Sequence, residues 1–317
     1  MSTAFAPKVA VFGAGAIGCY FGGMLARAGK EVTLIGRHDH VDAINTQGLF
    51  FKSINFEEVI VVRASTEPSA VKHAQLVLFC VKSGDTDAAA ASIAPILAAD
   101  AVLLSLQNGV DNIERIRSYV RNEALAGVVY TGVEMSGPGR LTHTGGGKVI
   151  LGHLGGKADT HQQELVKKLA VLFMEAGVSA SVSANIEVEL WSKLVLNCAY
   201  NALSAIGRMY YGPMVAIPEM RRLMTDAVEE VVMVAEAKDI HLPDNMLAAT
   251  FELAEVMPRT TSSTAQDIAR GRHTEIEHLN GYVAREGERL GIPTPVNRTL
   301  NALVKLLEQA NAIHKTP

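Results

Sequence analysis

The chain has few of the residues that build disulfide frameworks or metal centres. Only three of its 317 residues are cysteine, and Cys19, Cys80 and Cys198 lie far apart. None of them forms a CxxC pair or a Cys/His cluster with ligand spacing, and His273 and His278 lack the H-E-x-x-H spacing. We therefore expect reduced, buried thiols, no metal site and a cytoplasmic protein.

The chain also lacks an excess of positive charge. Its 29 lysines and arginines are outnumbered by 33 aspartates and glutamates, for a formal net charge of −4, and no basic stripe is present. Neither nucleic acid nor a membrane is therefore an expected partner. A hydrophobic content of 48% with 20% charged residues is typical of a soluble globular protein. Because 317 residues exceed what one core usually supports, two domains are expected.

The longest uncharged stretch, 9–26, is rich in glycine and carries a dinucleotide-binding pattern. The apolar run 9–12 suits a buried parallel strand, and Gly13, Gly15 and Gly18 follow it with G-x-G-x-x-G spacing. The first glycine allows a tight turn, the second lets the backbone approach a pyrophosphate, and the third lets the helix pack on the strand. The phosphates are expected at the helix N-terminus. The residues predicted to hold the cofactor here are Gly13, Gly15, Ala16, Ile17 and Gly18.

The next strand indicates which dinucleotide binds. A second apolar run, 32–35, completes a strand, glycine turn, helix, strand unit of the expected length. This context favours a dinucleotide site over a glycine turn that binds no ligand. An NAD site usually has Asp or Glu at the end of this strand, whereas an NADP site has Arg for the 2′-phosphate. Arg37 stands at that position, and Glu31 lies at the other end of the strand. The sequence therefore predicts NADPH as cofactor, the alternative being an ordinary surface arginine.

Apolar runs alternate with helical stretches through the first half of the chain. The runs 59–62, 76–81, 101–104 and 126–130 are expected to form strands, with helices such as 86–98 between them. This alternation is typical of a parallel sheet covered by helices.

The pattern changes in the middle of the chain. Alternating apolar positions in 131–156 predict antiparallel strands at a sheet edge, and a helix at 162–176 and a strand at 178–182 follow. Beyond that strand helical periodicity dominates and no further strand is expected. The sequence thus predicts an α/β protein with a Rossmann-type domain, residues 1–183, and an all-helical domain, residues 184–317.

Two strands of the predicted sheet end in polar residues. The run 76–81 leads into Lys82, and the run 102–106 leads into Gln107 and Asn108. Ligands of open α/β sheets bind at the carboxyl ends of the strands, so Lys82 and Asn108 are expected at the nicotinamide end of the cofactor. A solvated lysine and a turn asparagine before glycine explain the two residues equally well.

A polar stripe marks one helix of the second domain. Lys193, Asn197 and Asn201 have i, i+4, i+8 spacing and share one helical face, whereas the rest of 190–203 is apolar nearly all round. Such a helix is buried, and a lysine on it must find partners or shift its pKa. A polar cleft therefore explains the stripe better than a solvated face does, and a lysine there suits proton donation to a substrate oxygen.

The segment after residue 258 supplies more polar groups. Thr274 and Glu277 have the spacing of a capping box, so Glu277 is assigned to structure. Glu275 lies in the first turn of the same helix and is not needed by that box, although it would also favour the helix dipole. Ser262 and Ser263 precede another short helix and are candidate N-caps.

Together these residues resemble the ketopantoate reductase (2-dehydropantoate 2-reductase) family over nearly the whole chain. The blocks that carry the resemblance are GAGAIG, the strand-end Arg37, VK at Lys82, QNG at Asn108, WSKLVLNCAYNALSAI, SSTAQDI, HTEIEHLNG and GIPTP. It implies that Lys193 donates the proton to the keto oxygen and that Glu275 accepts from the substrate hydroxyl. The substrate residues it implies are Asn197, Asn201 and Ser263, and the residues it implies for NADPH and the closed site are Arg37, Lys82 and Asn108.

Two positions depart from the family's pattern on the substrate side. Thr264 stands where methionine is common, and Thr260 where asparagine is frequent. The expected partner is a small 2-keto acid, preferably 2-dehydropantoate, bound in a cleft between the domains. The alternatives are an NAD(P)-dependent dehydrogenase of another 2-keto or β-hydroxy acid, and a non-catalytic NADPH-binding regulator that needs no polar stripe. A homodimer is left open.

Overall fold

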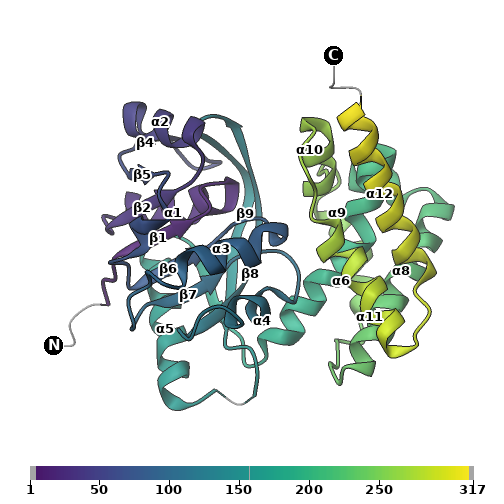
Figure 1. The fold of residues 1–317 in the computed structure, drawn as a ribbon. Coiled ribbons are helices and arrows are strands. Elements are labelled where there is room, and N and C mark those ends of the chain that lie inside the picture. The colour runs from purple at the N-terminus through teal and green to yellow at the C-terminus, as the bar shows by residue number, and fades with distance from the viewer. Residues whose placement is uncertain (1–4, 157, 314–317) are drawn as a thin grey trace. The chain divides into compact units, whose positions relative to one another are not determined.

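The computed structural model describes residues 5–156 and 158–313 (Figure 1). By its contacts the chain divides into two compact units. The first is Met1–Gln107 with Asp111–Ile186, and the second is Asn108–Val110 with Glu187–Pro317. The three-residue segment 108–110 thus groups with the second unit, although it follows a strand of the first.

A ten-stranded mixed sheet forms the centre of the first unit. Its order is β4-β3-β9-β8-β7-β6-β1-β2-β5, and β10 pairs with β9. The parallel part is formed by β1 (Val9–Phe12), β2 (Val32–Ile35), β5 (Arg63–Ser65), β6 (Leu76–Phe79), β7 (Val102–Ser105) and the start of β8 (Ala124–Gly137). Strands β1 and β6 are buried at every position, as their unbroken apolar sequence predicts for a sheet covered on both faces.

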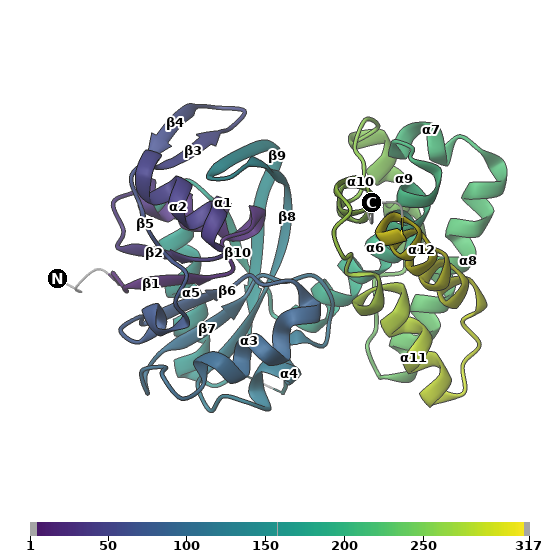
Figure 2. The same ribbon diagram turned by 45° about the horizontal axis from the view of Figure 1, so that its top comes forward.

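Helices cover both faces of this sheet. Phe21 of α1 (Ala16–Arg27) and Phe173 of α5 (Thr160–Glu175) meet edge to face with ring centroids 5.5 Å apart, so these two helices share one face. Helices α3 (Thr86–Ile93) and α4 (Asn112–Arg117) lie on the other side from α1 (Figure 2). The remaining helices of this unit are α2 (His38–Gln47), η1 (Pro68–Val71) and η2 (Ser83–Asp85).

One part of the sheet differs from the sequence expectation. The run 59–62 does not continue the parallel sheet: β4 (Glu57–Ile60) pairs antiparallel with β3 (Leu49–Lys52), and β3 pairs with β9 (Arg140–Gly152). The antiparallel β8–β9 hairpin therefore lies inside the sheet and not at its edge. The apolar composition of this run predicted a buried parallel strand, which is wrong. The run belongs to an edge strand, where Val59 is 56% exposed. The strand at 178–182 forms as expected, as β10 (Ser179–Val182).

The second unit is helical, and between residues 185 and 313 the described chain contains no strand, as predicted. Its long first helix, α6 (Ile186–Gly207), buries Trp191 and Tyr200 almost completely. The buried carboxylate of Glu230 accepts from the backbone N–H groups of Val296 and Asn297, and so caps the last helix. Its helices are α6 (Ile186–Gly207), α7 (Tyr211–Val215), α8 (Pro218–Ala237), α9 (Met246–Val256), α10 (Ser263–Arg270), η3 (Ile276–His278), α11 (Asn280–Leu290) and α12 (Pro295–Ile313). None of the helices in the described parts of the chain is long and apolar enough to span a bilayer.

Candidate functional site

The glycine turn after β1 has the geometry that a dinucleotide needs. Gly13 has φ +110°, and a Cβ there would lie 2.6 Å from Val81 N, so only glycine fits. A Cβ on Gly18 would collide with the carbonyl oxygen of Gly13, so this glycine allows α1 to pack closely. By contrast, a Cβ built on Gly15 would meet no atom of the rest of the described chain within 4 Å, its immediate chain neighbours aside. The backbone at Gly15 is therefore open to a ligand.

The N-terminus of α1 is available for an anion. Its N-cap is Gly15, which offers no side chain to bond the first N–H groups, and no acidic residue lies in the first turn of the helix. Ala16 and Ile17, the first two helical residues, are both partly exposed. Free N–H groups at a helix start favour phosphate, which fits the predicted cofactor.

Arg37 lies beside this turn. The carbonyl oxygen of Ile35 accepts from the N–H groups of Gly13 (2.9 Å) and Ala14 (2.8 Å), so the end of β2 is fixed to the glycine turn. Arg37 follows two residues later as the exposed N-cap of α2, and its side chain makes no capping bond. An exposed guanidinium at this place can reach a ribose 2′-phosphate.

Lys82 lies at the same edge of the sheet. The close approach of Gly13 to Cys80 and Val81 places the chain after β6 against the glycine turn, and Lys82 is the next residue. It is the N-cap of η2 and is partly buried. The first unit thus brings together the predicted cofactor residues of the glycine turn, Arg37 and Lys82.

In the second unit the polar stripe is carried by α6. Burial lowers the pKa of the Lys193 ammonium to about 8, and the negative charge of Glu275 acts in the opposite direction. Asn197 is partly exposed, whereas Asn201 is buried. The Nδ2 atom of Asn201 has no hydrogen-bond partner in the described chain. A buried donor without a partner is costly, which points to a ligand.

The paired serines have different roles. Ser262 is the N-cap of α10: its Oγ accepts from Ala265 N and donates to the carbonyl oxygen of Asn201, both at 3.0 Å. Ser262 therefore fixes the start of α10 to α6, as a cap residue can. Ser263 is the first helical residue of α10 and is exposed.

Glu275 has a different setting from the one expected. The capping box of Thr274 and Glu277 is wrong, because Glu277 forms ion pairs with Arg285 and Lys305 and the segment forms only the short η3. Glu275 is the N-cap of η3, and its side chain makes no capping bond there. The local spacing could not show that Glu277 pairs with Arg285 and Lys305, which lie later in the sequence.

Asn108 is hydrogen-bonded to Glu275. Its Nδ2 donates to Glu275 Oε2 at 2.9 Å, and both residues belong to the second unit. Nearby, the backbone N–H of Thr274 donates to Glu308 Oε1 of α12 at 2.6 Å and fixes the chain next to Glu275. Lys193, Glu275 and Asn108 therefore form one electrostatically connected group.

Sequence reasoning missed Gln107. Its side chain is buried and joins the ends of β6 and β7, with its Nε2 3.0 Å from Val81 O and 2.8 Å from Thr86 Oγ1. The signal that was present is a polar residue directly at the end of a buried strand.

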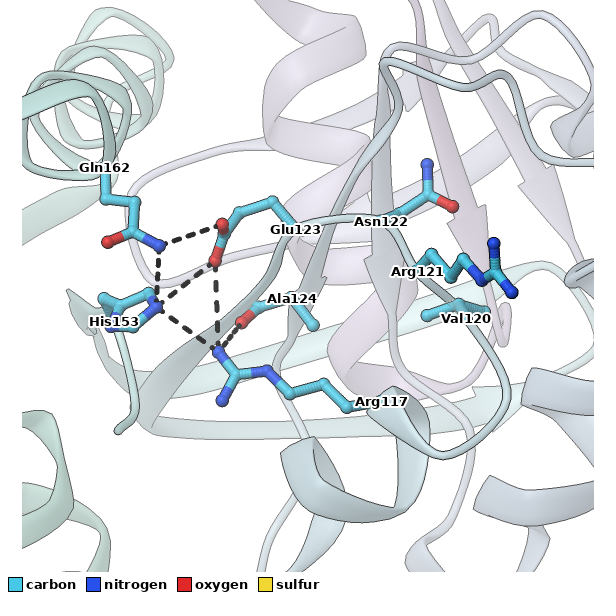
Figure 3. A pocket seen from close by; sticks show the side chains of 8 residues that line it. All are labelled: Arg117, Val120, Arg121, Asn122, Glu123, Ala124, His153 and Gln162. Carbon is cyan, nitrogen blue, oxygen red and sulfur yellow. Dashed lines mark hydrogen bonds and ion pairs between the residues drawn. The ribbon is translucent and has the colours of Figure 1, made fainter. Parts of the chain in front are cut away.

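A polar hollow of about 300 Å³ lies elsewhere, at the amino end of β8 (Figure 3). Its groups bind one another: Arg117 donates to Leu154 O and Ala124 O, and Gln162 donates to Glu123 and His153. The glycine turn lies at the opposite, carboxyl edge of the parallel strands. The hollow is therefore a structural cluster and not the cofactor site. Within residues 5–156 and 158–313, no three His, Cys, Asp or Glu side chains gather to hold a metal ion.

Family models match both units of the chain. Ketopantoate reductase PanE/ApbA matches residues 9–156, and its C-terminal model matches residues 185–308. The chain belongs to the ketopantoate reductase family. The expected architecture, an α/β unit followed by a helical one, is confirmed, and the family and the glycine turn together indicate a nicotinamide dinucleotide as cofactor.

Relatives of this family member cover nearly its whole length. The 2-dehydropantoate 2-reductase of Halobacterium salinarum is 32% identical, over 95% of this chain and 99% of its own. Among solved structures, a PanE/ApbA family ketopantoate reductase from Ralstonia eutropha JMP134 is 50% identical with a TM-score of 0.90, over 96% of this chain and 99% of its own. D-mandelate dehydrogenase with NADH and anilino(oxo)acetate is 28% identical, also with a TM-score of 0.90, over 96% and 99%.

Proposed function

We propose that this protein reduces 2-dehydropantoate to pantoate with NADPH, a step of pantothenate biosynthesis. The observation that carries the proposal is the polar face of α6, which has both a lysine with a lowered pKa and, two turns later, a buried amide donor without a partner in the described chain. Full-length likeness to curated 2-dehydropantoate 2-reductases supports the same reaction.

The first unit has the residues to hold NADPH. The open backbone at Gly15 and the uncapped start of α1 would bind the pyrophosphate, and Arg37 would pair with the 2′-phosphate. Lys82, beside the glycine turn, would contact the nicotinamide end. When bound, NADPH supplies the hydride that reduces the keto carbon.

Lys193 is the proposed proton donor to the keto oxygen. With a pKa of about 8 it is mostly protonated at neutral pH, yet it releases its proton more readily than an ordinary lysine. Its positive charge also stabilises the alkoxide as it develops. Asn197, Asn201 and the accessible Ser263 would bind the carboxylate and hydroxyl oxygens of the substrate.

Glu275 is the proposed acceptor for the substrate's 4-hydroxyl. Its Oε2 accepts from Asn108 at 2.9 Å, and each carboxylate oxygen can accept more than one hydrogen bond, so the same carboxylate would also accept from the substrate. We therefore propose that Asn108 orients Glu275, in addition to the expected role next to the cofactor.

A second candidate is reduction of a bulkier 2-keto acid. D-mandelate dehydrogenase matches this fold with the same TM-score as the ketopantoate reductase from Ralstonia eutropha. Thr264, which is buried in α10, differs from the family pattern and would change the size of the substrate site. A carboxylate at Glu275 favours 2-dehydropantoate, because only a hydroxylated substrate can donate to it.

The experiment that tests the proposal is a substrate panel. NADPH oxidation is measured with 2-dehydropantoate, with phenylglyoxylate and with 2-keto acids that lack the 4-hydroxyl. We expect the highest kcat/KM for 2-dehydropantoate. A higher value for phenylglyoxylate would support the second candidate, and NADPH binding without turnover of any keto acid would contradict both.

A further inference from the structure

The side chain of Gln107 joins three segments at the carboxyl edge of the sheet. Its Nε2 donates to Val81 O at 3.0 Å and to Thr86 Oγ1 at 2.8 Å, while its Oε1 accepts from Ser105 Oγ at 2.9 Å. Only 7% of the residue is exposed. Both N–H groups and the carbonyl oxygen are thus used inside the protein, and all four residues belong to the first unit.

The backbone of Val81 is contacted from two directions. A Cβ built on Gly13 would lie only 2.6 Å from the Val81 nitrogen, so the glycine turn packs directly on this residue. Its carbonyl oxygen accepts the bond from Gln107. The segment that leads into Lys82 therefore lies between the glycine turn and the Gln107 amide.

Thr86 extends the same network to the start of two helices. Thr86, the first residue of α3, donates from its Oγ1 to Oδ1 of Asn112, the first residue of α4, at 3.0 Å. Asn112 in turn reaches Ser83 Oγ at 3.5 Å, and Ser83 follows Lys82 directly. The buried polar chain thus runs around the Lys82 segment and returns to it.

A buried amide here is not needed simply to fill space. An apolar side chain of equal size would need no partners, whereas a buried polar network must satisfy every group and in return fixes one geometry. What this network fixes is the position of the Val81–Lys82 segment relative to the glycine turn.

We propose that Gln107 is a positioning residue for the dinucleotide: it holds the Val81–Lys82 segment against the Gly13 turn in the geometry that binds the cofactor. The inference rests on the proposed function, since it requires that the glycine turn and Lys82 bind NADPH. Gln107 does not itself need to contact the cofactor.

The test replaces the amide by an isosteric carboxylate, Gln107→Glu. This removes both N–H donors and places negative charge against the Val81 carbonyl oxygen. The matched control is Asn122→Asp, because the Asn122 amide also donates two hydrogen bonds inside the protein. They go to Ala98 O and Ala101 O, both at 2.9 Å, at the opposite end of β7. Both variants lose comparable hydrogen bonds, and only one lies beside the glycine turn.

The readouts are the Kd for NADPH, measured directly by titration, and the KM values for NADPH and the keto acid. In Gln107→Glu we expect the Kd and KM for NADPH to rise about tenfold or more, with the keto acid KM changed less than about threefold. Asn122→Asp is expected to keep the Kd within about twofold of wild type. If Gln107→Glu does not fold, Thr86→Val removes one partner of Gln107 and is expected to raise the Kd by about threefold or more.

Two outcomes overturn the inference. One is a folded Gln107→Glu, or Thr86→Val in its place, that binds NADPH as tightly as wild type. The other is an equal loss of affinity in Asn122→Asp, which would mean general damage to the unit. A wild-type protein that binds no NADPH would contradict the proposed function instead, so the two failures are distinguishable.

Discussion

At the scale of single residues, the proposed role of Lys193 as proton donor predicts a pH dependence of the reaction. Its pKa is lowered to about 8 by burial, so the fraction that carries a transferable proton falls as the pH rises through that value. We expect kcat/KM for keto acid reduction to be level below about pH 7 and to decline above pH 8. The measurement is a pH profile from 6 to 10 at saturating NADPH. A level profile through pH 9.5 would mean that Lys193 does not supply the proton.

Arg37 is expected to select NADPH over NADH. It is exposed at the end of β2, where a carboxylate would be needed for NAD. A charge-assisted contact with the 2′-phosphate is worth about 1.5–3 kcal/mol, so Arg37→Ala should lower kcat/KM for NADPH about 10- to 100-fold and leave that for NADH nearly unchanged. Comparison of both cofactors in both proteins checks this. Equal efficiency with NADH in wild type would remove Arg37 from cofactor selection.

Glu275 is expected to recognise the substrate hydroxyl. Glu275→Ala should lower kcat/KM for 2-dehydropantoate about tenfold or more, and should affect 2-keto acids without the hydroxyl much less. Asn108→Ala, which removes the group that orients Glu275, should show a smaller loss of the same kind. Equal losses on both substrate types, in variants with unchanged Tm, would show that Glu275 has no part in recognising the hydroxyl.

At the scale of elements, the glycines of the β1–α1 turn offer a matched pair of tests. Gly18→Ala forces a Cβ into the carbonyl of Gly13 and should destabilise the protein by about 1–3 kcal/mol or more. Gly15→Ala meets no described atom, so the Tm should stay close to wild type while the Kd for NADPH rises about tenfold. Thermal melts and NADPH titration measure the two effects. If Gly15→Ala bound NADPH normally, the pyrophosphate would not lie on this turn.

Some elements could be predicted from the sequence and others could not. The unit from β1 to β2 could be predicted because its glycine spacing and apolar runs are local and each has one explanation. The run 59–62 was misplaced, since apolar residues also occur in the exposed edge strand β4 and the choice of partner strand depends on distant residues. Glu277 was misassigned because its partners Arg285 and Lys305 come later in the chain.

At the scale of the whole molecule, the residues predicted for the cofactor and those predicted for the substrate are divided between the two units. The predicted cofactor residues Arg37 and Lys82 belong to the first unit, and Lys193 and Glu275 belong to the second. The spacing on one helix was enough to predict the stripe on α6. The pairing of Asn108 with Glu275 and the network around Gln107 could not be predicted, because they join residues that only the tertiary structure brings together. A homodimer and a cytoplasmic location stay predictions.

The central claim is that Lys193 donates the proton, and the most direct measurement is single-turnover reduction of 2-dehydropantoate by Lys193→Ala at saturating NADPH. Removal of a proton donor raises the barrier of the chemical step and leaves cofactor binding intact. We expect the rate to fall by about 10²- to 10⁴-fold, with the Tm and the Kd for NADPH close to wild type. A rate within a few-fold of wild type would contradict the account and would make the polar stripe of α6 a structural feature.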